Sequence, residues 1–386
     1  MNDFIFQNTT KIIFGKNAED YIGSEASIYG KTMLVFGGGS VRKNGVYDKV
    51  IRSMNESSVD YCELWGVMPN PRIDKVYEGI ELARKENVSL ILAVGGGSVI
   101  DTAKAIAAGV LYDGDAWDFY SGKRTPEIAL PVGSVLTIPA AGSESSMSSV
   151  ITNMNETEKR GCTAACFLPR FAIMNPENTF SLPPYQIACG ASDMMAHMME
   201  RYFVNTACCD LTDRMIEGAI QTVLEFTPLA LKNPQDYDIR AELMWTGCMA
   251  HNTILDTGRG GDWASHQIEH QLSAYYDIAH GAGLAIVFPA WMKFVRRTNP
   301  KKLVQFGQRV FRITDMNDDD TITLMIERLE EFYKAIGLPV RLSDAEIGSE
   351  NFAAMAEKAV EAKKNKLGSY VRLSNDDVAE IYRLAL

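Results

Sequence analysis

A short apolar run followed by consecutive glycines occurs twice in the first hundred residues and limits the folds that this chain can adopt. Met33–Phe36 precedes Gly37-Gly-Gly-Ser40, and Leu90–Val94 precedes Gly95-Gly-Gly-Ser98. The second turn leads directly into the helical pattern Ile100–Ala108. Strand, glycine turn and helix in this order form the βαβ unit of a parallel sheet.

Further segments continue this alternation. Helical patterns at Val46–Met54 and Val76–Glu86 lie between the strand-like runs, and the apolar segment Val135–Pro139 predicts another strand. Parallel strands that are buried on both faces are expected to be apolar throughout, as these runs are. The first part of the chain is therefore predicted to be an α/β, Rossmann-like domain with a parallel, dinucleotide-binding sheet.

The pattern changes after the double proline Pro183-Pro184. Long stretches rich in Ala, Met, Leu and Glu follow, with apolar residues three and four apart, beginning with Tyr185–Tyr202. We predict two domains, an α/β domain at 1–182 and an all-helical domain at 183–386. Clefts between domains are favoured ligand sites, so we expect the active site there.

Charge and composition exclude several classes of protein. The chain has 386 residues, 38 Lys and Arg against 49 Asp and Glu, and a net charge of −11, which gives no basic surface for nucleic acid. No run reaches the ~18 apolar residues of a membrane span, and Asp3 stands where a signal peptide carries basic charge. We expect a cytoplasmic protein without membrane contact.

The cysteines support the same compartment. Seven cysteines without a repeated spacing predict reduced thiols and no disulfide framework. Cys162 and Cys166 lack a second pair that would complete a zinc site, so we interpret them as small buried residues.

The second glycine turn suggests phosphate binding. Gly96 and Gly97 would let a pyrophosphate approach the start of a helix, where Ser98 offers a hydroxyl. Asp101 could accept a hydrogen bond from a ribose or an amide. A tight structural turn explains the glycines as well, because the segment is neither GxGxxG nor a P-loop.

The first turn suggests which dinucleotide would bind. It lacks the acid that would bond an adenosine ribose and repel a 2′-phosphate, whereas Ser40, Arg42 and Lys43 suit a phosphate. NADP(H) is therefore favoured over NAD(H), although Arg42 and Lys43 would also serve as a solvated surface pair. The hydroxyl-rich segment Thr137–Ser146 is a further candidate lining for the cofactor, or an ordinary polar loop.

The histidines are few and clustered. Four of the five lie in two helical-looking stretches, and the fifth, His251, is interpreted as structural. Asp193 and His197 are four residues apart, which suits a metal or, for an isolated pair, a helix salt bridge. His266, His270 and His280 could add up to three nitrogens, a set suited to Zn²⁺ or Fe²⁺. Spacing alone leaves open which of these three is not a ligand.

Three motifs together resemble one known family. They are the pattern Phe4–Gly15, interpreted as an N-terminal hairpin, GGGSVIDTAK from Gly95, and GDWASHQIEHQLSAYYDIAHG ending at Gly281. They resemble the iron-dependent (group III) alcohol dehydrogenase family, specifically its butanol dehydrogenase and aldehyde reductase branch, over nearly the whole chain. The resemblance implies a dehydroquinate synthase-like architecture, NADP(H) or NAD(H), and one divalent metal, Fe²⁺ or Zn²⁺. It implies oxidation of small primary alcohols or reduction of aldehydes such as butanal, with metal polarisation of the substrate oxygen and hydride transfer at nicotinamide C4.

The resemblance also assigns roles to residues. It makes Asp193, His197, His266 and His280 the metal ligands and places His270 beside the nicotinamide and the substrate as a catalytic non-ligand. The residues that it places around the dinucleotide are Gly38, Gly39, Ser40, Asn70, Gly96, Gly97, Ser98, Asp101, Thr137, Ser146 and Lys159. Two departures stand out: Ala141 replaces a Thr of many relatives, and the first glycine loop lacks the Asp of strictly NAD-using ones. The second departure supports NADP(H).

Alternative functions fit less well. A redox-neutral lyase of the dehydroquinate synthase type needs Lys and Arg near the metal motifs, and neither Asp193–Glu200 nor Asp262–His280 contains any. A metal-dependent hydrolase would leave both glycine turns unused. Met194, Met195 and Met198 hint at apolar substrates, although core packing explains them equally. The resemblance further predicts a homodimer that pairs the N-terminal strands of two copies.

Overall fold

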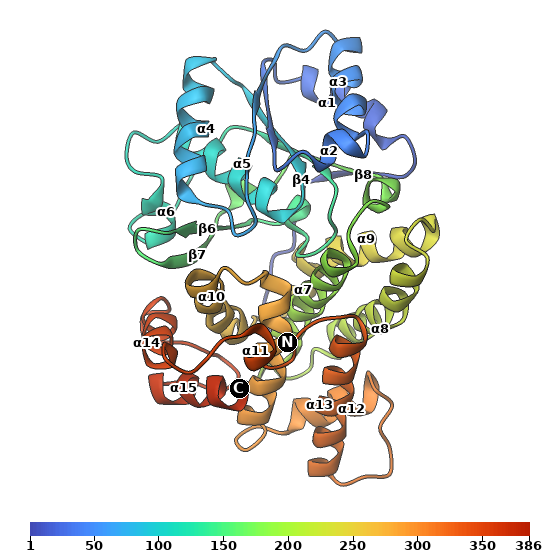
Figure 1. The fold of residues 1–386 in the computed structure, drawn as a ribbon, viewed down its shortest axis with the longest axis vertical. Helices are drawn as coiled ribbons and strands as arrows, with labels where there is room; N and C mark the ends of the chain where they lie inside the picture. Colours follow the sequence, from blue (N-terminus) through green and yellow to red (C-terminus); the bar gives the residue numbers. More distant parts are fainter. The chain divides into compact units, whose positions relative to one another are not determined.

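The computed structural model describes residues Met1–Leu386. Its contacts group into two compact units (Figure 1). The sheet unit comprises Gln7–Leu182 and Asn233–Asn252, and the helical unit comprises Met1–Phe6, Pro183–Lys232 and Thr253–Leu386. No helix is both long enough and apolar enough to cross a membrane.

The sheet unit contains a six-stranded parallel sheet with the strand order β1-β8-β5-β4-β2-β3. Its strands are β1 (Lys11–Phe14), β2 (Thr32–Phe36), β3 (Tyr61–Leu64), β4 (Leu90–Gly95), β5 (Val132–Leu136) and β8 (Phe171–Met174). Its helices are α1 (Ile22–Ser27), α2 (Ser40–Lys43), α3 (Val46–Glu56), α4 (Ile73–Lys85), α5 (Gly97–Val110), α6 (Trp117–Ser121) and α9 (Tyr237–His251). The predicted α/β domain with a parallel sheet is confirmed.

Alternation along the strands builds a core on each face of the sheet. Met33 and Val35 of β2 pack in one cluster with residues of α4 and α5. Leu34 and Phe36 of the same strand pack in the other cluster with residues of α1 and α3. Because helices cover both faces, the central strands are buried at every position, and this explains why they are apolar runs.

Two predicted details of this unit are wrong, and one feature was missed. The strand expected at Val135–Pro139 is β5, which begins three residues earlier and ends at Leu136. A small antiparallel pair, β6 (Ser148–Asn153) with β7 (Glu158–Thr163), was not predicted. Phe4–Gly15 forms no hairpin, because residues 4–10 contain no strand and β1 pairs in parallel with β8. The Asn8 amide instead donates to the carbonyls of Ser145 and Asn252, at 2.9 and 3.0 Å.

The helical unit contains no strand. Its helices are α7 (Pro184–Tyr202), α8 (Asp210–Lys232), α10 (Ala264–Tyr276), α11 (His280–Val295), α12 (Lys301–Arg309), α13 (Asp318–Ala335), α14 (Phe352–Glu361) and α15 (Asn375–Leu384). Short 3₁₀ turns over the chain are Ala18–Tyr21, Ser143–Ser145, Ala165–Phe167, Pro176–Thr179, Ile254–Asp256 and Ser343–Ala345. Pro184 occupies the first turn of α7, where proline needs no amide partner. Helices α7, α10 and α11 contact one another (Figure 1).

Candidate functional site

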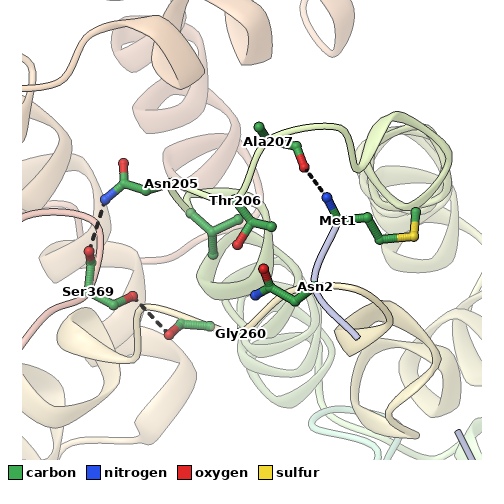
Figure 2. A pocket seen from close by; sticks show the side chains of 9 residues that line it. Met1, Asn2, Asn205, Thr206, Ala207, Gly260 and Ser369 are labelled. Atoms are coloured by element: carbon green, nitrogen blue, oxygen red, sulfur yellow. Dashed lines mark hydrogen bonds between the residues drawn. The ribbon is translucent and has the colours of Figure 1, made fainter. Parts of the chain in front are cut away.

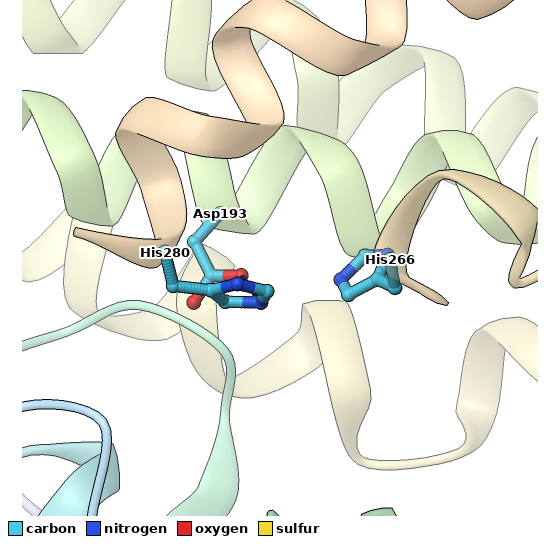
Figure 3. A group of neighbouring side chains, drawn as sticks. All are labelled: Asp193, His266 and His280. Carbon is cyan, nitrogen blue, oxygen red and sulfur yellow. Dashed lines mark ion pairs between the residues drawn. The ribbon is translucent and has the colours of Figure 1, made fainter. Parts of the chain in front are cut away.

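Three helices of the helical unit bring histidines and a carboxylate together. Asp193 lies on α7, His266 on α10 and His280 at the first position of α11. One ligand atom from each lies within 4.8 Å of the others, and Figure 3 shows the three side chains directed toward one another. Asp193 Oδ1 is 3.7 Å from His280 Nε2. The three groups could hold one cation.

His197 lies beside this group on the same face of α7 as Asp193. Its Nδ1 is 3.0 Å from Asp193 Oδ1 and 3.3 Å from His266 Nε2. It is not in the set of three whose ligand atoms are all mutually close. All four side chains that the resemblance nominates are therefore neighbours, three of them in a common cluster.

The electrostatics of the cluster suit a divalent cation. Asp193 Oδ1 is buried and lies 3.0 Å from His197 Nδ1. Burial by itself raises the pKa of Asp193, but the imidazoles of His197 and His280 outweigh it, so that the pKa lies below its ordinary value. Burial and the neighbouring imidazoles lower the pKa of His266 far below its ordinary value. An ionised carboxylate and neutral imidazoles are the forms that bind metals. These residue types therefore suit a divalent metal ion.

His270 lies on the next turn of α10. Its ring centroid is 5.6 Å from that of His280, and it forms a second close group with Glu269 and His280. It is absent from the group that contains Asp193. His270 therefore adjoins the cluster of Asp193, His266 and His280 without belonging to it.

Two buried carboxylates beside the cluster were missed by sequence reasoning. Glu200 Oε1 is 2.9 Å from His266 Nδ1, and Glu269 bonds His280 Nδ1. Glu200 lies two turns after Asp193 on α7, and Glu269 lies three residues after His266 on α10. That helical spacing was a signal that could have found them.

Most residues expected around the dinucleotide lie where three neighbouring parallel strands end. They follow β2, β4 and β5 at the carboxyl edge of the sheet, which is where open α/β sheets bind ligands. These residues are Gly38, Gly39 and Ser40 after β2, Gly96, Gly97 and Ser98 after β4, and Thr137 after β5. Cβ atoms at Gly38, Gly39 or Gly97 would meet nothing within 4 Å, so backbone is open to approach there.

The remaining predicted cofactor residues bond other parts of the protein. Lys159 Nζ donates to Asn70 Oδ1 at 3.0 Å. The Asp101 carboxylate accepts from Ser143 Oγ at 2.6 Å and from the Val150 amide at 2.9 Å. Asp101 therefore holds the loop after β5, in addition to any contact with a ligand.

Ser146 belongs to the same loop and contacts Lys104, which sequence reasoning did not single out. The fully buried Lys104 ammonium lies within hydrogen-bond distance of the carbonyls and hydroxyls of Ser143 and Ser146 and of the Ser148 carbonyl. Burial lowers the pKa of Lys104 to about 8, although the charges of Asp101 and Glu144 oppose the shift. Lys104 ties α5 to the loop that was predicted to line the cofactor.

A carboxylate missed from the sequence lies beside the first glycine loop. Glu63, in β3, is 3.9 Å from Arg42 and accepts hydrogen bonds from Tyr47 and Trp65. The Arg42 guanidinium lies over the Trp65 ring, 4.3 Å from its centroid. Glu63 follows the glycine turn by roughly 20 residues, where dinucleotide folds place an acid, and this spacing was an available signal.

The helical unit also contains a cavity of about 580 Å³ away from the histidines (Figure 2). Its polar groups bond one another: the Met1 ammonium donates to the Ala207 carbonyl, and the Asn205 amide donates to the Ser369 carbonyl. The methionines interpreted as a possible apolar lining, Met194, Met195 and Met198, are buried in the core. Neither feature adds to the candidate site.

Comparisons with known proteins agree with the fold and the motifs. Residues 187–386 match the model of the Fe-containing alcohol dehydrogenase family, C-terminal, and residues 9–176 match that of the iron-containing alcohol dehydrogenase. The chain is 44% identical to probable NADH-dependent butanol dehydrogenase 2 of Bacillus subtilis, with 100% of each chain covered. It is 36% identical to NADPH-dependent aldehyde reductase YqhD of Escherichia coli, again with 100% of each chain covered.

A solved structure extends the agreement to three dimensions. NADH-dependent butanol dehydrogenase A from Thermotoga maritima superposes with a TM-score of 0.96 at 42% identity, covering 100% of this chain and 99% of that one. The family resemblance is therefore confirmed, and the redox-neutral and hydrolytic alternatives are not favoured. The chain belongs to the iron-containing alcohol dehydrogenase family, whose members are oxidoreductases that use NAD(P)(H) and a divalent metal.

Proposed function

We propose that this chain interconverts small primary alcohols and aldehydes, such as butanol and butanal, with NAD(P)(H) and one divalent metal. The observation that carries the proposal is the convergence of Asp193, His266 and His280, with His197 beside them, on one point of the helical unit. The relatives that bear the names butanol dehydrogenase and aldehyde reductase support the substrate class. Fe²⁺ and Zn²⁺ both accept a carboxylate with imidazoles.

Each side chain has a separate part in this proposal. A divalent cation, when bound, supplies Lewis-acid polarisation of the substrate oxygen. Asp193 supplies negative charge that offsets the cation, and His197, His266 and His280 supply neutral nitrogens. His270 is the catalytic non-ligand that relays a proton to or from the substrate oxygen.

We propose NADP(H) as the preferred dinucleotide. Ser40 offers a hydroxyl, and Arg42 and Lys43 offer positive charge at the start of α2. Stacking on Trp65 limits the freedom of the Arg42 guanidinium, so little further entropy is lost when it binds a phosphate. The Arg42 charge and the Tyr47 and Trp65 donors offset Glu63, the carboxylate that would otherwise repel a 2′-phosphate.

The proposal is tested by stripping the protein of metal and reloading it with Fe²⁺ or Zn²⁺. We expect the protein to oxidise NADPH faster than NADH when butanal is added. This oxidation should occur only after the metal has been reloaded. Faster turnover with NADH would overturn the dinucleotide preference and leave the reaction class intact. Metal-independent turnover, or tight NADPH binding without turnover of any aldehyde tested, would contradict the proposed reaction.

Substitution of the proposed ligands tests the site itself. Asp193→Ala and His266→Ala should lose bound metal and turnover together, because each removes a ligand from one cluster. His251→Ala is the matched control, since His251 lies on α9 in the sheet unit, and it should retain both. Metal content by mass spectrometry and the rate of NADPH oxidation are the two measurements. Near-full activity of Asp193→Ala after dialysis against a chelator would exclude the assignment.

We also propose a cytoplasmic homodimer. The N-terminal segment exposes Phe4, Ile5 and Phe6, with Ile5 97% exposed, and a second copy would bury this apolar surface. All seven cysteines are free thiols, as a reducing compartment favours. Light scattering should give twice the chain mass, and Ile5→Glu should shift it toward the monomer. A monomeric wild-type protein would contradict the dimer.

A further inference from the structure

Glu200 connects two of the helices that bear proposed ligands. It lies on α7 with Asp193 and His197, is 1% exposed, and reaches across to α10. Its carboxylate accepts hydrogen bonds from the backbone amides of Trp263 and His266. Trp263 precedes α10 with φ 60° and offers no side-chain cap, so Glu200 takes the place of a capping residue.

The same carboxylate contacts the imidazole of His266. Glu200 Oε1 lies 2.9 Å from His266 Nδ1. An ionised carboxylate has no proton to donate, so in this contact the ring must be the donor. A neutral His266 imidazole therefore carries its proton on Nδ1. The lone pair of Nε2 then remains for a cation.

Glu269 repeats this arrangement one helix further along. It lies on α10, one turn after His266, and is fully buried. It accepts hydrogen bonds from Ser273 Oγ and from Nδ1 of His280, which begins α11. The Nε2 of His280 is then the atom that faces Asp193, at 3.7 Å.

We propose that Glu200 and Glu269 are positioning residues that set the tautomer and orientation of His266 and His280 for metal binding. Each carboxylate lies on one ligand-bearing helix and holds the ligand of the next, so that α7 fixes α10 and α10 fixes α11. The inference rests on the proposed function, because it takes the Asp193 cluster as the metal site. Mutation of a carboxylate that bonds a metal ligand in this way typically lowers the metal affinity by about 10- to 100-fold.

The second close group, Glu269 with His270 and His280, is explained by the same inference. The oxygens of Glu269 already accept from Ser273 and from His280. An orienting role uses those bonds as they stand.

The test compares metal affinity and coordination in matched variants. Glu200→Gln and Glu269→Gln keep the size of the side chain and remove its charge. We expect Zn²⁺ affinity, measured by competition with a chelator, to fall at least tenfold in each, and the visible absorption of the Co²⁺-loaded protein to change. Glu217→Gln is the control, because Glu217 is a buried carboxylate of the same unit that bonds Tyr202 and no proposed ligand. It should leave the affinity within about twofold of the wild type.

A measurement on the wild-type chain requires no variant to fold. Nitrogen–proton correlation spectra of the Zn²⁺-loaded, histidine-labelled protein should show Nδ1–H tautomers for His266 and His280. Nε2–H tautomers would overturn the inference, as would wild-type affinity in both Gln variants or an equal loss in Glu217→Gln. If His266→Ala itself retains metal, the proposed site fails; if it loses metal while both Gln variants bind normally, only the positioning role fails.

Discussion

Among single residues, the sheet unit buries a lysine and a glutamate beside its predicted cofactor loop. Lys104 on α5 and Glu144 in the 3₁₀ turn Ser143–Ser145 are both 1% exposed or less. Burial raises the pKa of Glu144 to about 7, and a backbone hydrogen bond, the Lys104 charge and a Cys248 contact only partly offset the rise. The loop therefore contains a carboxyl group that titrates close to neutral pH.

This shift predicts how stability depends on pH. The pKa of Glu144 rises from 4.5 to about 7 on folding, so the folded chain binds more protons than the unfolded chain in that interval. The stability that this group contributes is full below pH 4.5 and is lost as the pH rises through 7. We expect Glu144→Gln to remove a slope of up to about 1.4 kcal/mol per pH unit from the free energy of unfolding.

Urea titrations of the sheet unit's unfolding between pH 4.5 and 7 would measure the slope. The control is Glu127→Gln, which alters an exposed carboxylate of the same unit and should keep the wild-type slope. Parallel curves for wild type and Glu144→Gln would contradict the shift.

Some residues of the site could be predicted from the sequence and others could not. Asp193, His197, His266 and His280 were identifiable because helical spacing and a family motif mark them. Spacing left open which of His266, His270 and His280 is not a ligand, because all three lie on or beside one helix. Glu63 was missed because its position depends on β3 lying beside β2, a contact between segments that are far apart in the sequence.

Among the elements, the cluster of Asp193, His266 and His280 depends on how closely α7 and α11 pack. A Cβ atom on Gly281 would lie 2.1 Å from the backbone oxygen of Cys189, so only glycine allows this approach. Gly281 directly follows His280, and Cys189 lies one turn before Asp193. The same contact thus sets the separation between two proposed ligands.

Gly281→Ala should therefore push the two helices apart. We expect it to destabilise the helical unit by about 1–3 kcal/mol, as overpacking does, and to weaken metal binding as well. Gly218→Ala on α8 is the matched control, because a Cβ there meets nothing within 4 Å, and alanine should stabilise that helix by about 0.4–1 kcal/mol. Urea denaturation of the metal-free proteins measures the first effect and chelator competition the second. Wild-type stability and affinity in Gly281→Ala would contradict this account.

The bounds of helices and strands could be predicted best where the hydrophobic pattern is clear. The buried strands β2 and β4 and the helices α3, α4, α5 and α7 begin and end within a few residues of the predicted positions. The hairpin β6–β7 was missed because its strands are polar, with Ser, Thr, Lys and Glu at many positions. The N-terminal hairpin was wrong because β1 pairs in parallel with β8, which lies far away in the sequence, and residues 4–10 contain no strand.

At the scale of the whole molecule, each unit supplies one half of the proposed chemistry. The sheet unit gathers glycines and hydroxyls at the ends of three adjacent strands, and the helical unit gathers a carboxylate and imidazoles. The chain-wide resemblance indicated this division. Local pattern could not show that Asn233–Asn252, which contains α9, groups with the sheet unit, because that depends on contacts with residues far away in the chain.

We propose that one divalent cation binds where Asp193, His197, His266 and His280 meet. Anomalous diffraction from crystals of the Zn²⁺- or Fe²⁺-loaded protein, collected at the absorption edge of that metal, tests it most directly. We expect one strong anomalous peak per chain, bounded by these four side chains. A peak held by Glu269 and His270 instead, or peaks only elsewhere in the chain, would contradict it.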